Sequence, residues 1–136
     1  KITRTTTLKA FYTYTTGKIT TRQAGKDTTY NNLLRRPKSS IGINLASQVC
    51  NSFFISTKLM SAGKRNDAYF DNTTFATVYT TLKSYALWDI YVEYGFLKNK
   101  LKVFTNLRNI TGSKYTEISG FNTLGFNGYG GILFSF

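Results

Sequence analysis

Residues 127–136 read N-G-Y-G-G-I-L-F-S-F and end the sequence on an apolar, strand-like segment. Side chains along a strand point alternately to its two faces, so Ile132, Phe134 and Phe136 share one face. Chain ends in water are commonly polar and loosely held. Two phenylalanines at the end of a strand therefore indicate an apolar environment around it. The opposite face carries Tyr129, Gly131, Leu133 and Ser135.

A lipid bilayer would supply that environment, because membrane-spanning barrels carry aromatic girdles at both water interfaces. A polar residue, a glycine and two terminal aromatic residues recur here at fixed spacing, as Tyr129, Gly131, Phe134 and Phe136. This order resembles the C-terminal assembly signal of bacterial outer-membrane barrels. The alternative for these residues alone is the last strand of a soluble β-sandwich.

Composition favours strands and excludes several kinds of chemistry. The 136 residues fit one domain, are rich in Thr, Tyr and Phe, and include a single proline, Pro37. The sequence has no run of about 18 apolar residues, which excludes a membrane-spanning helix. It has no histidine, and Cys50 is its one cysteine. Histidine-based catalysis, a disulfide framework and a thiolate metal site are therefore excluded within this chain. Because it begins at Lys1, we expect a mature product, a fragment or one piece of a larger assembly.

Six segments alternate between apolar and polar side chains, as strands with one apolar face do. They are residues 5–17, 39–50, 53–62, 84–96, 101–108 and 127–136. The connections alternate between long and short, and the long ones are 18–38, 63–82 and 109–125. Short strand extensions are expected within the second, at 68–70 and 75–79. The alternation is typical of outer-membrane barrels, which have short periplasmic turns and long extracellular loops. We predict an all-β, antiparallel transmembrane barrel segment of about six strands, with the long loops outside the cell.

The mid-strand charges lie opposite the aliphatic face, where they would avoid lipid. A lipid-facing Lys or Arg at the membrane midplane would cost about 2 to 4 kcal/mol. We expect Asp89 and Glu93 to face Lys58 and Lys102 across the wall of the barrel. The two carboxylates lie about 13 Å apart along a strand, too far for paired carboxylate catalysis, so no enzyme is expected. The mid-strand charges are Lys9, Lys58, Asp89, Glu93, Lys102 and Arg108.

The formal net charge of +12 has two interpretations. A basic, aromatic-rich β protein could bind single-stranded nucleic acid by stacking bases on Tyr and Phe. Its aromatic residues should then cluster with Lys and Arg, whereas Trp88, Tyr94 and Phe96 lie on a face without charges. We therefore expect no nucleic acid as a partner. The basic residues of the first long connection are instead expected to face lipopolysaccharide phosphates or the mouth of the barrel.

Several runs, in this order, resemble the end of TonB-dependent outer-membrane receptors. They are L-L-R-R-P-K at 33–38, G-K-R-N-D at 63–67, L-W-D at 87–89, N-L-R-N-I-T-G-S-K-Y-T-E at 106–117 and G-F-N-T-L-G at 120–125. The first and third are most similar to the vitamin B12 (cobalamin) receptor branch. The resemblance implies a barrel of about 22 strands with a plug inside it, of which residues 1–136 form the C-terminal part without a plug.

The resemblance also implies active import across the bacterial outer membrane, with energy supplied by TonB through the plug. The expected partners are the remainder of the barrel and its plug, in the same or a separate chain, outer-membrane lipid, lipopolysaccharide and a surface lipoprotein. No covalently bound cofactor is expected, and cobalamin is the expected transported ligand. Arg35 and Arg36 lie near the entrance in this family, and we expect them to contact substrate together with Tyr115 and Asn122. The alternatives are a siderophore or haem receptor and, in another class, an eight-stranded structural or adhesive barrel.

Overall fold

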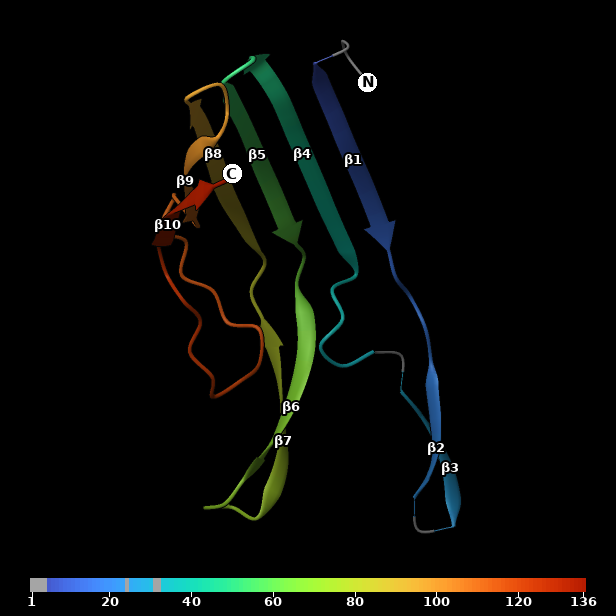
Figure 1. Ribbon diagram of the computed structural model, residues 1–136. Helices are drawn as coiled ribbons and strands as arrows, with labels where there is room; N and C mark the ends of the chain where they lie inside the picture. Colours follow the sequence, from blue (N-terminus) through green and yellow to red (C-terminus); the bar gives the residue numbers. More distant parts are fainter. Residues whose placement is uncertain (1–4, 24, 31–32) are drawn as a thin grey trace.

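The computed structural model describes residues 5–23, 25–30 and 33–136, and in this part of the chain the regular elements are all strands (Figure 1). Six of them form one antiparallel sheet in the order β1-β4-β5-β8-β9-β10. Its strands are β1 (Thr6–Tyr14), β4 (Ser39–Cys50), β5 (Phe53–Ala62), β8 (Tyr85–Phe96), β9 (Leu101–Arg108) and β10 (Asn127–Phe134). All six predicted strands are confirmed. Among the described residues, no helix has the length and apolar character needed to cross a membrane.

Two hairpins extend from the same end of this sheet, and each is a separate two-stranded sheet (Figure 1). One is β2 (Ile19–Gln23) with β3 (Lys26–Tyr30), and the other is β6 (Arg65–Asp71) with β7 (Ala76–Leu82). The second hairpin confirms the predicted strand extensions. It pairs with itself and does not widen the main sheet, which contradicts the eight-stranded alternative.

The hairpin β2–β3 corrects our expectation of an irregular loop over residues 18–38. Threonine favours extended backbone, and the Thr20 and Thr29 hydroxyls lie 3.1 Å apart across the pair. Gly25 adopts a φ of 80° in the turn, a conformation that glycine enters without steric cost. Both faces of this hairpin are polar, so the sequence lacks the apolar alternation that revealed the other strands.

The short turns lie at the opposite end of the main sheet. Residues 51–52 join β4 to β5, and residues 97–100 join β8 to β9. The Asn99 side-chain amide ties one turn to the other by donating to the Asn51 carbonyl at 3.0 Å, and the Gly95 N–H, near the end of β8, donates to the Ser52 carbonyl at 2.7 Å. The predicted alternation of long and short connections is therefore confirmed, with the long ones all at one end.

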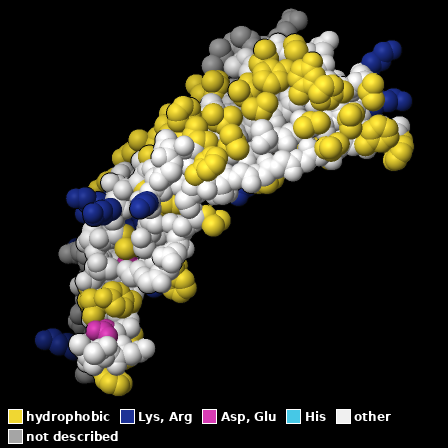
Figure 2. All heavy atoms as spheres, turned by 90° about the vertical axis from the view of Figure 1, so that its left-hand side faces the viewer, with side chains coloured by type: hydrophobic (Ala, Val, Ile, Leu, Met, Phe, Trp, Pro, Cys, Tyr) yellow, Lys and Arg dark blue, Asp and Glu magenta, His cyan; other side chains and the backbone are white. Residues whose placement is uncertain are grey.

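One face of the sheet is apolar and uncovered. The strand register places Leu8 opposite Leu45, and Leu59 opposite both Ile43 and Trp88. Trp88 is 42% exposed, and Ala62 and Leu82 are the buried hydrophobic residues of the described chain. Figure 2 shows hydrophobic side chains gathered over the sheet, with Lys and Arg beyond the edges of this band. A single-layer sheet of this kind has no core of its own. An apolar partner or an apolar environment must therefore cover this face.

The other face is polar and carries the predicted charge pairs. Lys102 forms a salt bridge with Glu93, with 2.9 Å between Nζ and Oε1, and the Tyr91 hydroxyl donates to the second Glu93 oxygen at 2.8 Å. Lys58 lies directly opposite Asp89 in the register. The expectation that Asp89 and Glu93 face Lys58 and Lys102 across neighbouring strands is therefore confirmed.

Gly131 in β10 makes room for an aromatic ring of the neighbouring strand. Phe104 is its direct partner in the register, and a Cβ on Gly131 would lie 2.8 Å from the Phe104 ring. The ring is itself flanked by Tyr91 and Tyr129, with centroid distances of 6.0 and 6.4 Å. Any larger residue at position 131 would therefore push Phe104 out of its aromatic contacts.

We predict that Gly131→Val destabilises the folded barrel by about 1 to 3 kcal/mol, the usual cost of forcing extra atoms into a filled space. Urea midpoints of the intact barrel in detergent would measure the change. Gly125→Val is the matched control, because Gly125 has nothing within 4 Å of an added Cβ. Equal midpoints for the two variants would contradict the steric role of Gly131.

Candidate functional site

The three long connections meet at the carboxylate of Asp67, which is fully buried in the hairpin β6–β7. Its Oδ1 accepts hydrogen bonds from Arg35 Nε at 2.7 Å and from the Ala68 N–H at 2.8 Å. Its Oδ2 accepts one from the Ser119 N–H at 2.7 Å. One side chain of the second connection thus holds the first connection through Arg35 and the third through Ser119.

The surroundings of Asp67 keep it charged. Burial raises the pKa of this carboxyl, but hydrogen bonds from the Ser119 N–H, the Arg35 guanidinium and the Ala68 N–H outweigh that effect and lower the pKa to about 2, from an ordinary value of 3.8. The carboxylate is therefore ionised at every physiological pH. Its negative charge is compensated by Arg35 and by two backbone dipoles.

Arg65 reinforces this junction from the same strand. It lies two residues before Asp67, hence on the same face of β6, and its side chain is almost fully buried. The guanidinium donates to the carbonyls of Thr116 and, at 3.5 Å, Lys83. It also lies 4.9 Å from the centre of the Tyr85 ring, a cation–π contact. Arg65 thus binds the third connection to the start of β8.

The third connection is organised at its beginning by Asn109, which is 3% exposed and has a φ of 49°. Its side-chain oxygen accepts the Ser113 N–H, and its amide donates to the Ser113 carbonyl, both at 2.9 Å. The Asn109 N–H donates to Asp89 Oδ1 at 2.9 Å. Asp89, on the polar face of the sheet, therefore fixes where the loop leaves the wall.

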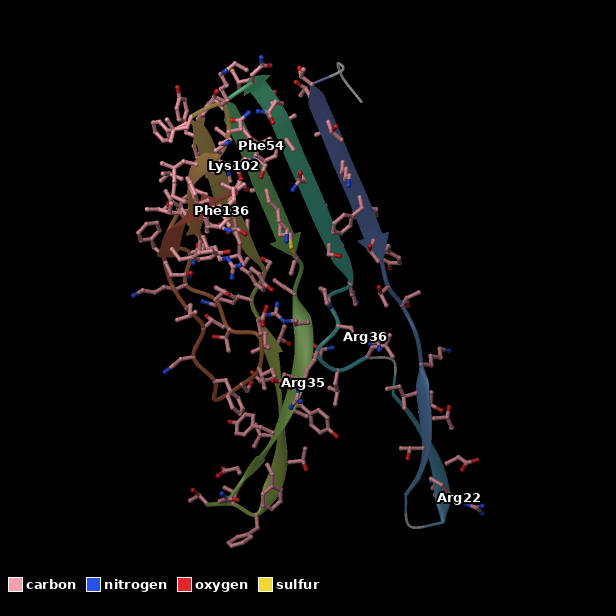
Figure 3. All side chains as sticks on the ribbon, viewed as in Figure 1. Arg22, Arg35, Arg36, Phe54, Lys102 and Phe136 are labelled. Carbon is pink, nitrogen blue, oxygen red and sulfur yellow. The ribbon has the colours of Figure 1, made fainter. Side chains whose placement is uncertain are left out.

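The structure brings two of the four predicted substrate-contact residues into this junction. Arg35 is held by Asp67, and its own N–H donates to the Asn66 carbonyl at 2.7 Å. Tyr115 packs on Tyr85 with 4.6 Å between ring centroids. Arg36 and Asn122 are exposed, and Figure 3 shows Arg35 close to β6, with Arg36 beside it in the first connection. Contact of these four residues with a substrate stays a prediction.

The residues of the predicted assembly signal divide between the two faces of β10. Tyr129 lies on the polar face, where the Asn106 amide donates to its hydroxyl at 3.0 Å and Arg108 lies 5.4 Å from its ring centre. Phe134 and Phe136 form an edge-to-face pair at 5.2 Å, and Phe136 is completely exposed. The terminal aromatic residues are thus free to meet lipid or an assembly partner.

Our sequence interpretation missed Arg65 and Asp67 as central residues, because both fell in a segment expected to be mostly loop. The available signal was their spacing, since residues two apart in an extended segment share a face. Within the described residues, no group of three His, Cys, Asp or Glu side chains could hold a metal ion.

No protein-family model matches the chain, and no curated protein sequence matches it. Solved structures match it in fold. The structure of the FpvAI–pyocin S2 complex aligns with 98% of this chain at a TM-score of 0.74 and 15% identity. The ferripyoverdine receptor of the outer membrane of Pseudomonas aeruginosa, bound to ferripyoverdine, aligns with 97% at 0.72 and 16% identity. The pyoverdine receptor FpvA of the PAO1 strain, bound to pyoverdine, aligns with 99% at 0.69 and 16% identity.

This chain spans 17%, 18% and 20% of those three chains. At such identities the likeness concerns the fold, and it confirms the predicted class: an all-β, antiparallel sheet shaped like part of the barrel of an outer-membrane receptor. None of these three structures is described as a vitamin B12 receptor, so they do not support the predicted vitamin B12 branch. Two are described with pyoverdine or its ferric form bound, which agrees with the siderophore alternative.

We predict that the Asp67 junction opens in acid. Because the folded-state pKa of about 2 lies below the ordinary 3.8, the charge on Asp67 stabilises the junction fully above about pH 4, and that contribution is lost as the pH falls toward 2. Hydrogen exchange of the Ser119 amide in the intact barrel, corrected for its intrinsic rate, should lose protection over this range.

Asp67→Asn should remove that protection already at neutral pH. Asp71→Asn is the control, because Asp71 bonds only within its own hairpin turn, to Thr73 and Thr74. Unchanged Ser119 protection in Asp67→Asn would contradict the junction.

Proposed function

We propose that this chain forms part of the barrel wall of a TonB-dependent receptor that imports a ferric siderophore across a bacterial outer membrane. The observation that carries the proposal is the six-stranded sheet with one uncovered apolar face, which aligns over nearly its whole length with ferripyoverdine receptors. The proposal covers location, energy source and substrate class, and each has its own support.

The outer-membrane location rests on the apolar face. Strands of 8 to 12 residues match the length that a tilted strand needs to cross a bilayer. Lipid would cover the exposed apolar side chains and the aromatic residues at the end of β10. In lipid, an unpaired backbone group costs several kcal/mol, so the open edges of β1 and β10 need further strands beside them. The remainder of a larger barrel would supply these strands.

The transport role rests on the polar face and on the arrangement of the long connections. The polar face carries paired charges suited to an aqueous lumen containing a plug. All long connections lie at one end of the sheet, where they would form the mouth of the barrel on the outside of the cell. Import against a gradient requires energy, and we propose that TonB supplies it through the plug.

An iron chelate suits this mouth better than cobalamin does. The chain carries 18 basic and 6 acidic residues, and such an excess attracts anionic ligands, which many ferric chelates are. The runs that resemble the vitamin B12 branch also have structural roles. Arg35 binds Asp67, while Trp88 donates from its indole to the Thr57 hydroxyl at 2.6 Å. These runs therefore do not favour cobalamin over an iron chelate.

We predict that the intact receptor binds a ferric siderophore and does not bind cobalamin in calorimetry. Arg36→Ala should weaken siderophore binding about tenfold or more, because it removes a charge-assisted donor worth about 1.5 to 3 kcal/mol. The amount of receptor in the membrane should stay constant. Lys114→Ala is the control, since Lys114 is another exposed loop cation. Binding of cobalamin in place of the ferric siderophore would contradict the proposed substrate class and would not affect the assignment of the barrel fold.

Deletion of Phe136 should lower the level of receptor in the outer membrane, because this exposed ring ends the proposed assembly signal. Quantitative blots of isolated outer membranes would measure it. Phe121→Ala is the control, since Phe121 is a similarly exposed ring in the third connection. Normal membrane levels of the truncated receptor would show that Phe136 has no part in assembly.

A further inference from the structure

A cavity of about 300 Å³ lies where the first and second connections leave the main sheet. Its lining residues include Lys38, Lys64 and Arg65, and none of the lining residues is acidic. Neutral hydrogen-bonding side chains, among them Thr15, Asn66 and Thr81, complete the polar part of the wall. A hollow with this lining attracts a ligand of opposite charge.

Backbone hydrogen bonds bring the two lysines to this cavity. The Thr15 N–H donates to the Lys38 carbonyl at 2.9 Å, which fixes Lys38 beside the end of β1. The Gly63 N–H donates to the Ser39 carbonyl at 2.8 Å and so holds Lys64 next to the start of β4. Both lysines are exposed, and neither forms an ion pair with another described residue.

The remaining groups are oriented as donors. The Thr81 hydroxyl donates to the side-chain oxygen of Asn66 at 3.2 Å, so the amide nitrogen of Asn66 is left to donate elsewhere. Arg65 is held in place by the carbonyls of Lys83 and Thr116. The cavity thus offers the ammonium groups of Lys38 and Lys64 and the amide of Asn66, a combination that suits an oxyanion.

None of the six acidic residues lines this cavity, and each lies beside a partner elsewhere in the structure. Asp67 binds Arg35, and Glu93 binds Lys102. Asp71 caps a hairpin turn, Asp89 accepts the Asn109 N–H, and Glu117 accepts the Tyr85 hydroxyl. Asp27, the sixth, lies opposite Arg22 in the hairpin β2–β3.

We propose that the cavity beside Lys38 and Lys64 is a binding site for a phosphate group. A phosphate offers several strong acceptor oxygens and up to two negative charges, which match the two lysines better than a single carboxylate would. The phosphate has two potential sources. One is a lipid headgroup at the membrane surface, which rests on the proposed outer-membrane function: the cavity begins at Thr15, at the level along β1 where the exposed apolar face ends with Tyr14. The other is a soluble phosphate-bearing ligand.

The test uses the intact receptor, freed of lipid in detergent, and two probes. Pyrophosphate binding is measured by calorimetry at low salt, and retention of bisphosphorylated lipid A is measured by native mass spectrometry after reconstitution in lipid A nanodiscs. The variant Lys38→Gln with Lys64→Gln removes both free charges and shortens each side chain by only one atom. The control is Lys26→Gln with Lys114→Gln, which removes two exposed charges outside the cavity.

We expect the double variant in the cavity to lose about tenfold or more in affinity for at least one probe, since each lost charge-assisted bond is worth about a factor of ten. The control should bind both probes as the unmodified receptor does. A loss confined to lipid A assigns the site to a lipid headgroup, and a loss confined to pyrophosphate assigns it to a soluble ligand. Equal binding by the cavity variant and the unmodified receptor, or no binding of either probe, overturns the proposal.

A titration with ferric siderophore on the same samples separates this site from the proposed function. Siderophore binding that survives in the cavity variant, together with loss of phosphate, makes the two sites independent. Phosphate binding in a receptor that binds no siderophore overturns the substrate assignment and leaves the phosphate site intact.

Discussion

The sheet has one layer, and no described residue of its own chain covers its apolar face. Burial of apolar surface is the main favourable term in folding, yet only Ala62 and Leu82 are buried hydrophobic residues in the described part of the chain. The backbone pairs of neighbouring strands hold the sheet together, and the environment must supply the rest. The aromatic end of β10, the exposed Trp88 and the open edges of β1 and β10 are all consequences of this one constraint.

Acidic and basic residues have different roles in this structure, because acidic residues are few. Acidic groups are few, and the structure uses them to position backbone and basic groups: Asp67 joins the three connections, and Asp89 fixes the start of the third. The basic residues outnumber them threefold, 18 to 6. Among the described residues only Arg35 and Lys102 form ion pairs, so exposed cations such as Arg36 remain in the long connections. A fully buried carboxylate would be costly without its donors, and Asp67 has three. The few acidic residues thus hold the long connections in place, and the excess of basic residues leaves these connections positively charged.

The sequence predicted the main sheet well because alternation is a local property. Each of the six strands has one apolar face, and the period of two identified it without knowledge of its neighbours. The hairpin β2–β3 was missed because both of its faces are polar. The junction at Asp67 could not be predicted either, since it depends on Arg35 and Ser119, which lie 32 and 52 residues away in the sequence. Arg35 and Tyr115 were among the site residues predicted from the sequence. Their contacts with Asp67 and Tyr85 could be seen only in the fold.

The runs that resemble receptor sequences coincide with places where the fold leaves little choice of residue. Arg35, Asp67 and Asn109 each lie in one of these runs, and each binds backbone or a buried partner. Such requirements arise from the barrel and its loops, whatever the receptor carries. Under the proposed receptor function, ligand specificity would depend on residues free of those requirements, such as the exposed Arg36 and Asn122. The family resemblance therefore reports the architecture, while the charge of the exposed mouth bears on the ligand.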